Sequence, residues 1–148
     1  MDTIVYDGIE IKGTKTFITY TTKALDLIKK AKGDYDYFAF VRRTVGIIQE
    51  HSQSGMVVYN TPPMFQVGKP TYTASVSWYA SCIVHDANHS YQYRLNKPYH
   101  GKESENECLK VQIEFLRRIN GPKHEISHLE NLLKNEVDYY SSNIKRTW

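Results

Sequence analysis

The chain has 148 residues, of which 41% are hydrophobic and 24% charged, and its net charge is +3. This length fits one domain, which usually has about 100–150 residues, so we expect residues 1–148 to form a single domain. A weak charge with both signs interspersed argues against nucleic-acid binding. No apolar run approaches the ~20 residues that cross a bilayer, so we expect no membrane association. The first residues do not resemble a signal peptide, which predicts a cytoplasmic protein.

The first third of the chain predicts a strand pair and two helices. Alternating apolar residues from Thr3 to Lys12 predict a short hairpin. Thr21 and Thr22 precede an amphipathic run that ends before Gly33, which is typical of a short helix. Asp34 is placed to cap a second helix that continues to about Gln53, because apolar residues recur there at helical spacing.

The remainder predicts two short strands and three helices. Residues 55–68 contain two apolar runs around Pro62 and Pro63, which favours two strands at a sheet edge. Residues 71–95 are apolar nearly all round, so this helix belongs in the core. Ser104 and Glu107 match a capping box for a helix over 105–119, and a last helix is expected over 123–141. The predicted fold class is α+β, mainly helical, with a small edge-containing sheet packed on the helix over 71–95.

Two histidines in that apolar helix, His85 and His89, form the main chemical signal of the sequence. At i,i+4 spacing both imidazoles project from the same helix face, about one turn apart. Two buried imidazoles without partners are costly, and a shared metal ion satisfies them. Hydrogen bonds to the backbone or to tyrosines satisfy them as well, so core histidines remain the alternative.

The acidic residues around this pair are unevenly distributed. Asp86 follows His85 directly and is the only carboxylate between His51 and Lys102. A carboxylate next to the first metal-binding histidine is placed to take a proton from a zinc-bound water. Three acids then follow, Glu103, Glu105 and Glu107. Because the capping box uses Glu107, we favour Glu105 as the third ligand, at a helix N-terminus that stabilises its ionised form.

The segments from Trp78 to Ser90 (WYASCIVHDANHS) and from Glu105 to Cys108 (ENEC), with Gln112, resemble the zincin metallopeptidases. They are most similar to minimal gluzincin-like members, which have an HExxH helix and a downstream glutamate helix. The resemblance covers roughly residues 71–119. It implies that His85, His89 and Glu105 bind Zn²⁺ and that Asp86 is the general base. This sequence departs from the family pattern because HDANH replaces HExxH, so the base is an aspartate, whose side chain is one methylene shorter than that of glutamate.

The resemblance implies a zinc-dependent hydrolase, with a peptide or protein as substrate. In this mechanism a zinc-bound water attacks the carbonyl while Asp86 accepts the proton. The oxyanion that forms needs a hydrogen-bond donor. Candidate donors follow the histidines in sequence: Tyr91, Tyr93, Tyr99 and His100. The strands over residues 55–68 are candidates for binding an extended peptide along their edge.

Other interpretations of the same residues stay open. Cys82 and Cys108 could join His85 and His89 in a closed structural zinc site, which would make the chain a non-catalytic metal-binding or interaction domain. The two cysteines could instead form a disulfide, or one could serve a Cys–His–Asp site, although a buried mid-helix thiol is poorly activated.

A literal HExxH motif also occurs, at residues 124–128. It follows Gly121 and Pro122 at the start of a helix and has polar neighbours, so we predict a solvated amphipathic helix there.

Overall fold

The computed structural model describes residues 1–134, which form an α+β fold, as predicted. A five-stranded sheet has the order β1-β2-β3-β5-β4. Its strands are β1 (Asp2–Tyr6), β2 (Ile9–Gly13), β3 (Ile47–Glu50), β4 (Gly55–Val57) and β5 (Met64–Val67). β1 and β2 form the expected hairpin, β3 runs parallel to both β2 and β5, and β4 is an antiparallel edge strand.

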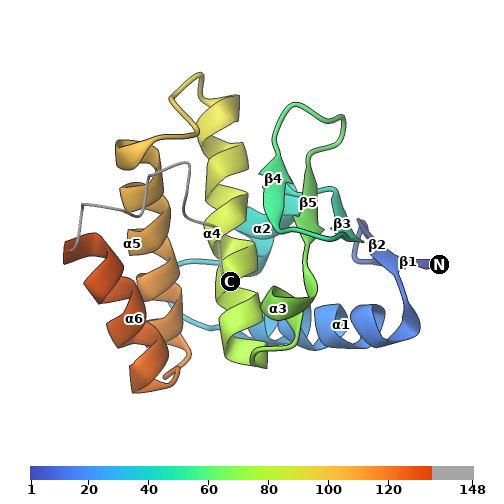
Figure 1. Ribbon diagram of the computed structural model, residues 1–148, viewed down its shortest axis with the longest axis horizontal. Helices are drawn as coiled ribbons and strands as arrows, with labels where there is room; N and C mark the ends of the chain where they lie inside the picture. Colours follow the sequence, from blue (N-terminus) through green and yellow to red (C-terminus); the bar gives the residue numbers. More distant parts are fainter. Residues whose placement is uncertain (135–148) are drawn as a thin grey trace.

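The helices make up most of the described chain. They are α1 (Lys15–Lys30), α2 (Tyr37–Thr44), α3 (Lys69–Tyr72), α4 (Val76–Arg94), α5 (Lys102–Arg118) and α6 (Lys123–Lys134). α4 stands between the sheet on one side and the α5–α6 pair on the other (Figure 1). Residues of α4 contact β4 and β5, which confirms that the sheet packs on the helix with the two histidines.

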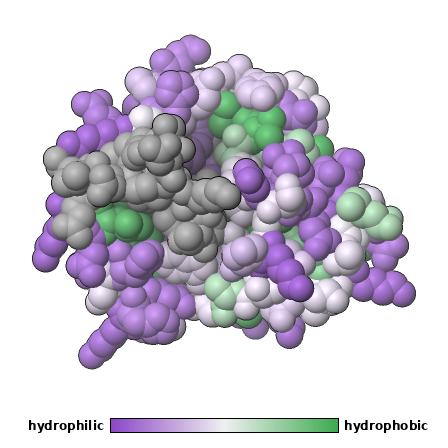
Figure 2. All heavy atoms as spheres, viewed as in Figure 1, coloured by the Kyte–Doolittle hydropathy of each residue, from purple (hydrophilic) through white to green (hydrophobic). Residues whose placement is uncertain are grey.

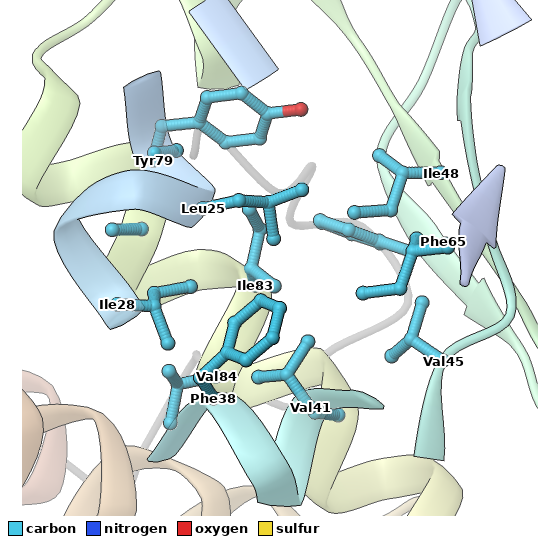
Figure 3. Close-up of a cluster of buried hydrophobic side chains, with 14 of the residues drawn as sticks. Leu25, Ile28, Phe38, Val41, Val45, Ile48, Phe65, Tyr79, Ile83 and Val84 are labelled. Carbon is cyan, nitrogen blue, oxygen red and sulfur yellow. The ribbon is translucent and has the colours of Figure 1, made fainter. Parts of the chain in front are cut away.

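Two apolar clusters meet on α4 and explain why this helix is apolar nearly all round. The larger cluster joins α1, α2 and the sheet to one side of α4, where Ile83 and Val84 are fully buried (Figure 3). The smaller cluster joins α4 to α5 and α6 through Trp78, Cys82, Leu109, Ile113, Leu116 and Leu129. Burial on both sides fixes the position of α4, and therefore the side chains that it carries between the clusters.

The second predicted helix is too long, because residues 34–53 form a helix and a strand. α2 ends at Thr44, and residues 47–50 form the central strand β3. Ile47 and Ile48 are β-branched and lie in the sheet between β2 and β5, so tertiary pairing outweighs the helical spacing of the apolar residues. Gly46 separates the two elements.

Three helix starts differ from the prediction. α1 begins at Lys15, because Thr14 accepts a hydrogen bond from the Phe17 backbone N–H. The helix predicted over 71–95 is divided into α3 and α4, and the Ser75 side chain caps α4. α5 begins at Lys102 after Gly101, whose φ is 91°.

The predicted capping box is wrong, because α5 begins at Lys102 and both Ser104 and Glu107 lie inside it. Their side chains form hydrogen bonds with side chains of α4 instead. Residues 135–141 of the last predicted helix lie outside the described residues.

The view in Figure 2 shows a described surface that is mostly hydrophilic, with hydrophobic residues in a few separate places. Among residues 1–134, no helix combines the length and the apolar character that crossing a bilayer requires.

Candidate metal centre

α4 and α5 bring His85, His89 and Glu105 into direct contact. One carboxylate oxygen of Glu105 lies 3.1 Å from His85 Nε2, and the other lies 2.9 Å from His89 Nε2. The histidines face α5 because they occupy one face of α4. Glu105 reaches them from the first turn of α5, where the helix dipole favours a negative charge. The three side chains that the sequence grouped are thus neighbours in space.

The site is enclosed but not sealed. His85 is fully buried and His89 is 6% exposed, whereas the Glu105 side chain keeps 22% of its surface accessible. Of the three side chains, Glu105 is therefore the most exposed to solvent.

The second nitrogen of each imidazole has partners of its own. His85 Nδ1 lies 2.8 Å from Gln112 Oε1. His89 Nδ1 lies 3.2 Å from Ser104 Oγ and 3.3 Å from Gln92 Oε1. The sequence named Gln112 in the zincin resemblance and Ser104 in a capping box, but it indicated no role for Gln92. Gln92 lies one turn after His89, so helical spacing alone was the available signal.

Cys108 completes a second set of potential ligands. Single ligand atoms of His85, His89 and Cys108 lie within 4.8 Å of one another, and all three residues are buried. These residues form a cluster that could hold a metal ion. Cys82 is not part of this cluster, and both cysteines are free thiols, so they form no disulfide.

Burial and hydrogen bonding act in opposite directions on the charges of this site. Burial raises the pKa of Glu105, but hydrogen bonds from His85 and His89 outweigh it and hold that pKa well below its usual range. Burial likewise disfavours the charged form of His89, yet its contacts with Cys108 and Glu105 raise its pKa. The thiol of Cys108 has a raised pKa, mainly because it is buried. The carboxylate of Glu105 is thus anionic, whereas the thiol of Cys108 stays protonated.

Asp86 is 1% exposed and adjoins His85 on α4. Its negative charge is among the causes that raise the pKa of His89, so it acts on this cluster. Of the other two acids considered, Glu103 is exposed. Glu107 accepts hydrogen bonds from Asn88, Gln92 and Lys97.

The four candidate oxyanion donors lie near the C-terminal end of α4 and in the loop that follows. Tyr91 packs against Phe40, with ring centres 5.6 Å apart. Tyr93 packs edge-on against Tyr99, which in turn contacts His100. Tyr91 and Tyr93 are more than a third exposed. Their part in any reaction stays a prediction.

The literal HExxH motif lies in α6, where its glutamate makes contacts with α4. Its histidines, His124 and His128, are exposed, and only Glu125 is buried. Glu125 accepts hydrogen bonds from Ser75 (2.7 Å) and Ser77 (2.8 Å) at the start of α4. The glutamate of this motif therefore attaches α6 to α4.

No family model, curated protein or solved structure matches the chain. The likeness to zincins thus rests on the residues of α4 and α5 described above.

Proposed function

We propose that this protein is a zinc-dependent hydrolase that acts on peptides, with His85, His89 and Glu105 as zinc ligands. The observation that carries the proposal is the contact of one Glu105 carboxylate with the Nε2 atoms of both histidines. Two imidazoles and a carboxylate are a donor set of catalytic zinc sites, which keep a further position for water or substrate. Glu105 is the most exposed of the three side chains, with 22% of its surface accessible.

The burial of His85 and His89 supports the binding of a cation between these histidines and Glu105. A carboxylate only accepts hydrogen bonds, so both Nε2 atoms must carry protons to bond Glu105 in the metal-free protein. Burial disfavours the charged form of both imidazoles, and at His89 the contacts with Cys108 and Glu105 outweigh it. Binding of a cation by the same three groups removes the need for those protons.

Asp86 is the proposed general base. Bound zinc supplies a water of lowered pKa and polarises the scissile carbonyl. Asp86 follows His85 directly in α4 and is the acid nearest to it in sequence. Its proposed part is to accept the proton of the attacking water and to pass it to the leaving amine. A tyrosine of the group Tyr91, Tyr93 and Tyr99, or His100, is the proposed donor to the oxyanion.

The edge strand β4 is the proposed binding surface for the peptide. β4 contacts α4 and pairs on one side with β5, and no other strand of the described chain pairs with it. An extended peptide binds such an edge through backbone hydrogen bonds. A peptide bound there would lie next to α4, the helix that carries His85, His89 and Asp86.

Hydrolysis of a peptide library by the zinc-loaded protein tests the proposal. Asp86→Asn should keep zinc and lose about 100-fold or more of the rate, as expected for loss of a general base. His85→Ala should lose both zinc and hydrolysis, and His124→Ala, the matched change in the exposed motif, should lose neither. Equal rates for wild type and Asp86→Asn, or full activity after zinc removal, would contradict it.

A second candidate is supported by the position of Cys108. Because its thiol lies near both histidines, a closed site of His85, His89 and Cys108 would make the protein a non-catalytic metal-binding domain. In that case zinc binds without hydrolysis of any peptide, and Cys108→Ala abolishes zinc binding.

A further inference from the structure

The amide of Gln112 has one orientation that satisfies its neighbours. Ser81 Oγ lies 2.7 Å from the carbonyl oxygen of Trp78 and donates its only proton to it. Ser81 Oγ must therefore accept from Gln112 Nε2, 3.0 Å away. This fixes Gln112 Oε1 toward His85 Nδ1, at 2.8 Å. An amide oxygen only accepts hydrogen bonds, so Nδ1 of His85 carries a proton.

Gln92 is oriented in the same way on the other histidine. Its Nε2 lies near two acceptors, the carbonyl oxygen of Ser104 (3.2 Å) and the carboxylate of Glu107 (3.3 Å). Its Oε1 therefore faces Ser104 Oγ, which donates to it across 2.6 Å. Having given up its proton, Ser104 Oγ accepts from His89 Nδ1 at 3.2 Å. Nδ1 of His89 also carries a proton.

We propose that Gln92 and Gln112 are positioning residues that hold both histidines as Nδ1–H tautomers. Once a cation displaces the Nε2 protons that bond Glu105 in the metal-free protein, each imidazole has its single lone pair on Nε2, and both Nε2 atoms face the Glu105 carboxylate. The two nitrogen atoms and the carboxylate that would bind a divalent cation are thus already directed to one place. This proposal rests on the metal site proposed above and adds the residues that prepare it.

Because Gln92 and Gln112 are amides, they add no charge to the buried cluster. A hydrogen bond to the second nitrogen fixes the ring and its tautomer, whichever acceptor makes it. A carboxylate acceptor would add another buried charge, whereas an amide adds none. With two neutral amides, a divalent cation is balanced by the two carboxylates at the cluster, Glu105 and Asp86. Glu107, which orients Gln92, is paired with Lys97 instead.

Zinc affinity, measured by competition with a chromophoric chelator, tests the proposal. Gln112→Leu removes the acceptor and should weaken binding about 10–100-fold. Gln112→Glu keeps an acceptor for Nδ1–H, and the Ser81 hydroxyl can turn to donate to it, so its affinity should stay within about threefold of wild type. Gln92→Leu and Gln92→Glu repeat the comparison on His89. Thermal melting of each metal-free variant identifies any that does not fold.

Nitrogen-15 spectra of the histidines in the wild-type protein give a readout that does not depend on a variant. In the zinc-loaded protein, both rings should carry the proton on Nδ1. A proton on Nε2 of either zinc-bound ring, or equal zinc affinities for wild type and Gln112→Leu, would overturn the positioning role alone. Failure of the wild-type protein to bind zinc would overturn the proposed metal site, and this inference with it.

Discussion

Glu105 and Cys108 lie one turn apart on α5, and both contact His89. Only one of them completes the proposed ligand set. The carboxylate bonds both Nε2 atoms and is ionised, whereas the thiol is buried and its pKa is raised. A protonated thiol is a weaker ligand, because a metal binds the thiolate. The contacts of the two side chains therefore favour glutamate over cysteine.

Replacing Cys108 by alanine is the residue-scale test of this choice. Because the thiol is outside the proposed ligand set, zinc affinity should change by less than about threefold. The measurement is a zinc titration against a competing chelator. Complete loss of zinc binding in a folded Cys108→Ala protein would instead support the closed site.

Gly46 separates α2 from β3 and shows why an element boundary was missed. A Cβ at this position would collide with the ring of Pro62, which belongs to the turn between β4 and β5. The glycine therefore allows the start of β3 to lie against the proline turn. That requirement comes from residues far away in the chain, so the helical spacing of residues 37–48 gave no sign of it.

Gly46→Ala should accordingly destabilise the fold by about 1–3 kcal/mol, the usual cost of overpacking. Gly55→Ala is the matched control, since a Cβ there meets nothing within 4 Å and should change stability by less than about 0.5 kcal/mol. Urea unfolding of both variants measures the difference. Equal free energies of unfolding for the two variants would contradict the packing described for Gly46.

Glu125 provides a second test at the scale of elements, because it joins α6 to the start of α4. Its carboxylate accepts from Ser75 and Ser77. Glu125→Ala removes both hydrogen bonds and should cost about 2 kcal/mol of stability. Zinc binding should be unchanged, because the exposed motif of α6 is not the metal site. Loss of zinc at wild-type stability would contradict this assignment.

Glu50 connects the stability of the whole molecule to pH. It accepts from the Thr14 backbone N–H (2.9 Å) and the Tyr72 hydroxyl (2.7 Å), and so joins β3 to α1 and α3. Burial alone would raise the pKa of Glu50, but these hydrogen bonds lower it. A carboxyl group whose pKa is lower in the folded protein stabilises the fold above its ordinary pKa, and that stabilisation is lost as pH falls.

Glu50→Gln should therefore lower the free energy of unfolding by about 1 kcal/mol at pH 7, a partly solvated charge-assisted contact being worth less than a buried one. The difference from wild type should shrink as pH falls below about 4.5, the ordinary value for this group. Denaturant unfolding across pH 3–7 measures it, with Glu103→Gln as an exposed control. A difference that stays constant over this range would contradict the stated role of Glu50.

At the scale of the molecule, the sequence predicted the α+β class and the helix that carries the candidate site. Both predictions rest on the spacing of residues that are close together in the chain. Spacing alone puts His85 and His89 on one face of a helix, and their apolar flanks require that helix to be buried. The hydrogen bonds of Gln92, Ser104 and Gln112 depend on how α5 docks on α4, which no local pattern contains. The capping box failed for the same reason, since Ser104 and Glu107 serve the contact between these helices.

Zinc titration of the metal-free protein, compared with Glu105→Gln and Glu103→Gln, tests the central claim most directly. The two glutamates lie in the same helical turn, but only Glu105 contacts the histidines. Wild type and Glu103→Gln should each bind a single zinc ion with equal affinity. Glu105→Gln should bind at least about 100-fold more weakly, because a neutral amide replaces an anionic ligand. Wild-type protein that binds no zinc, or Glu105→Gln that binds it as tightly as wild type, would contradict the account.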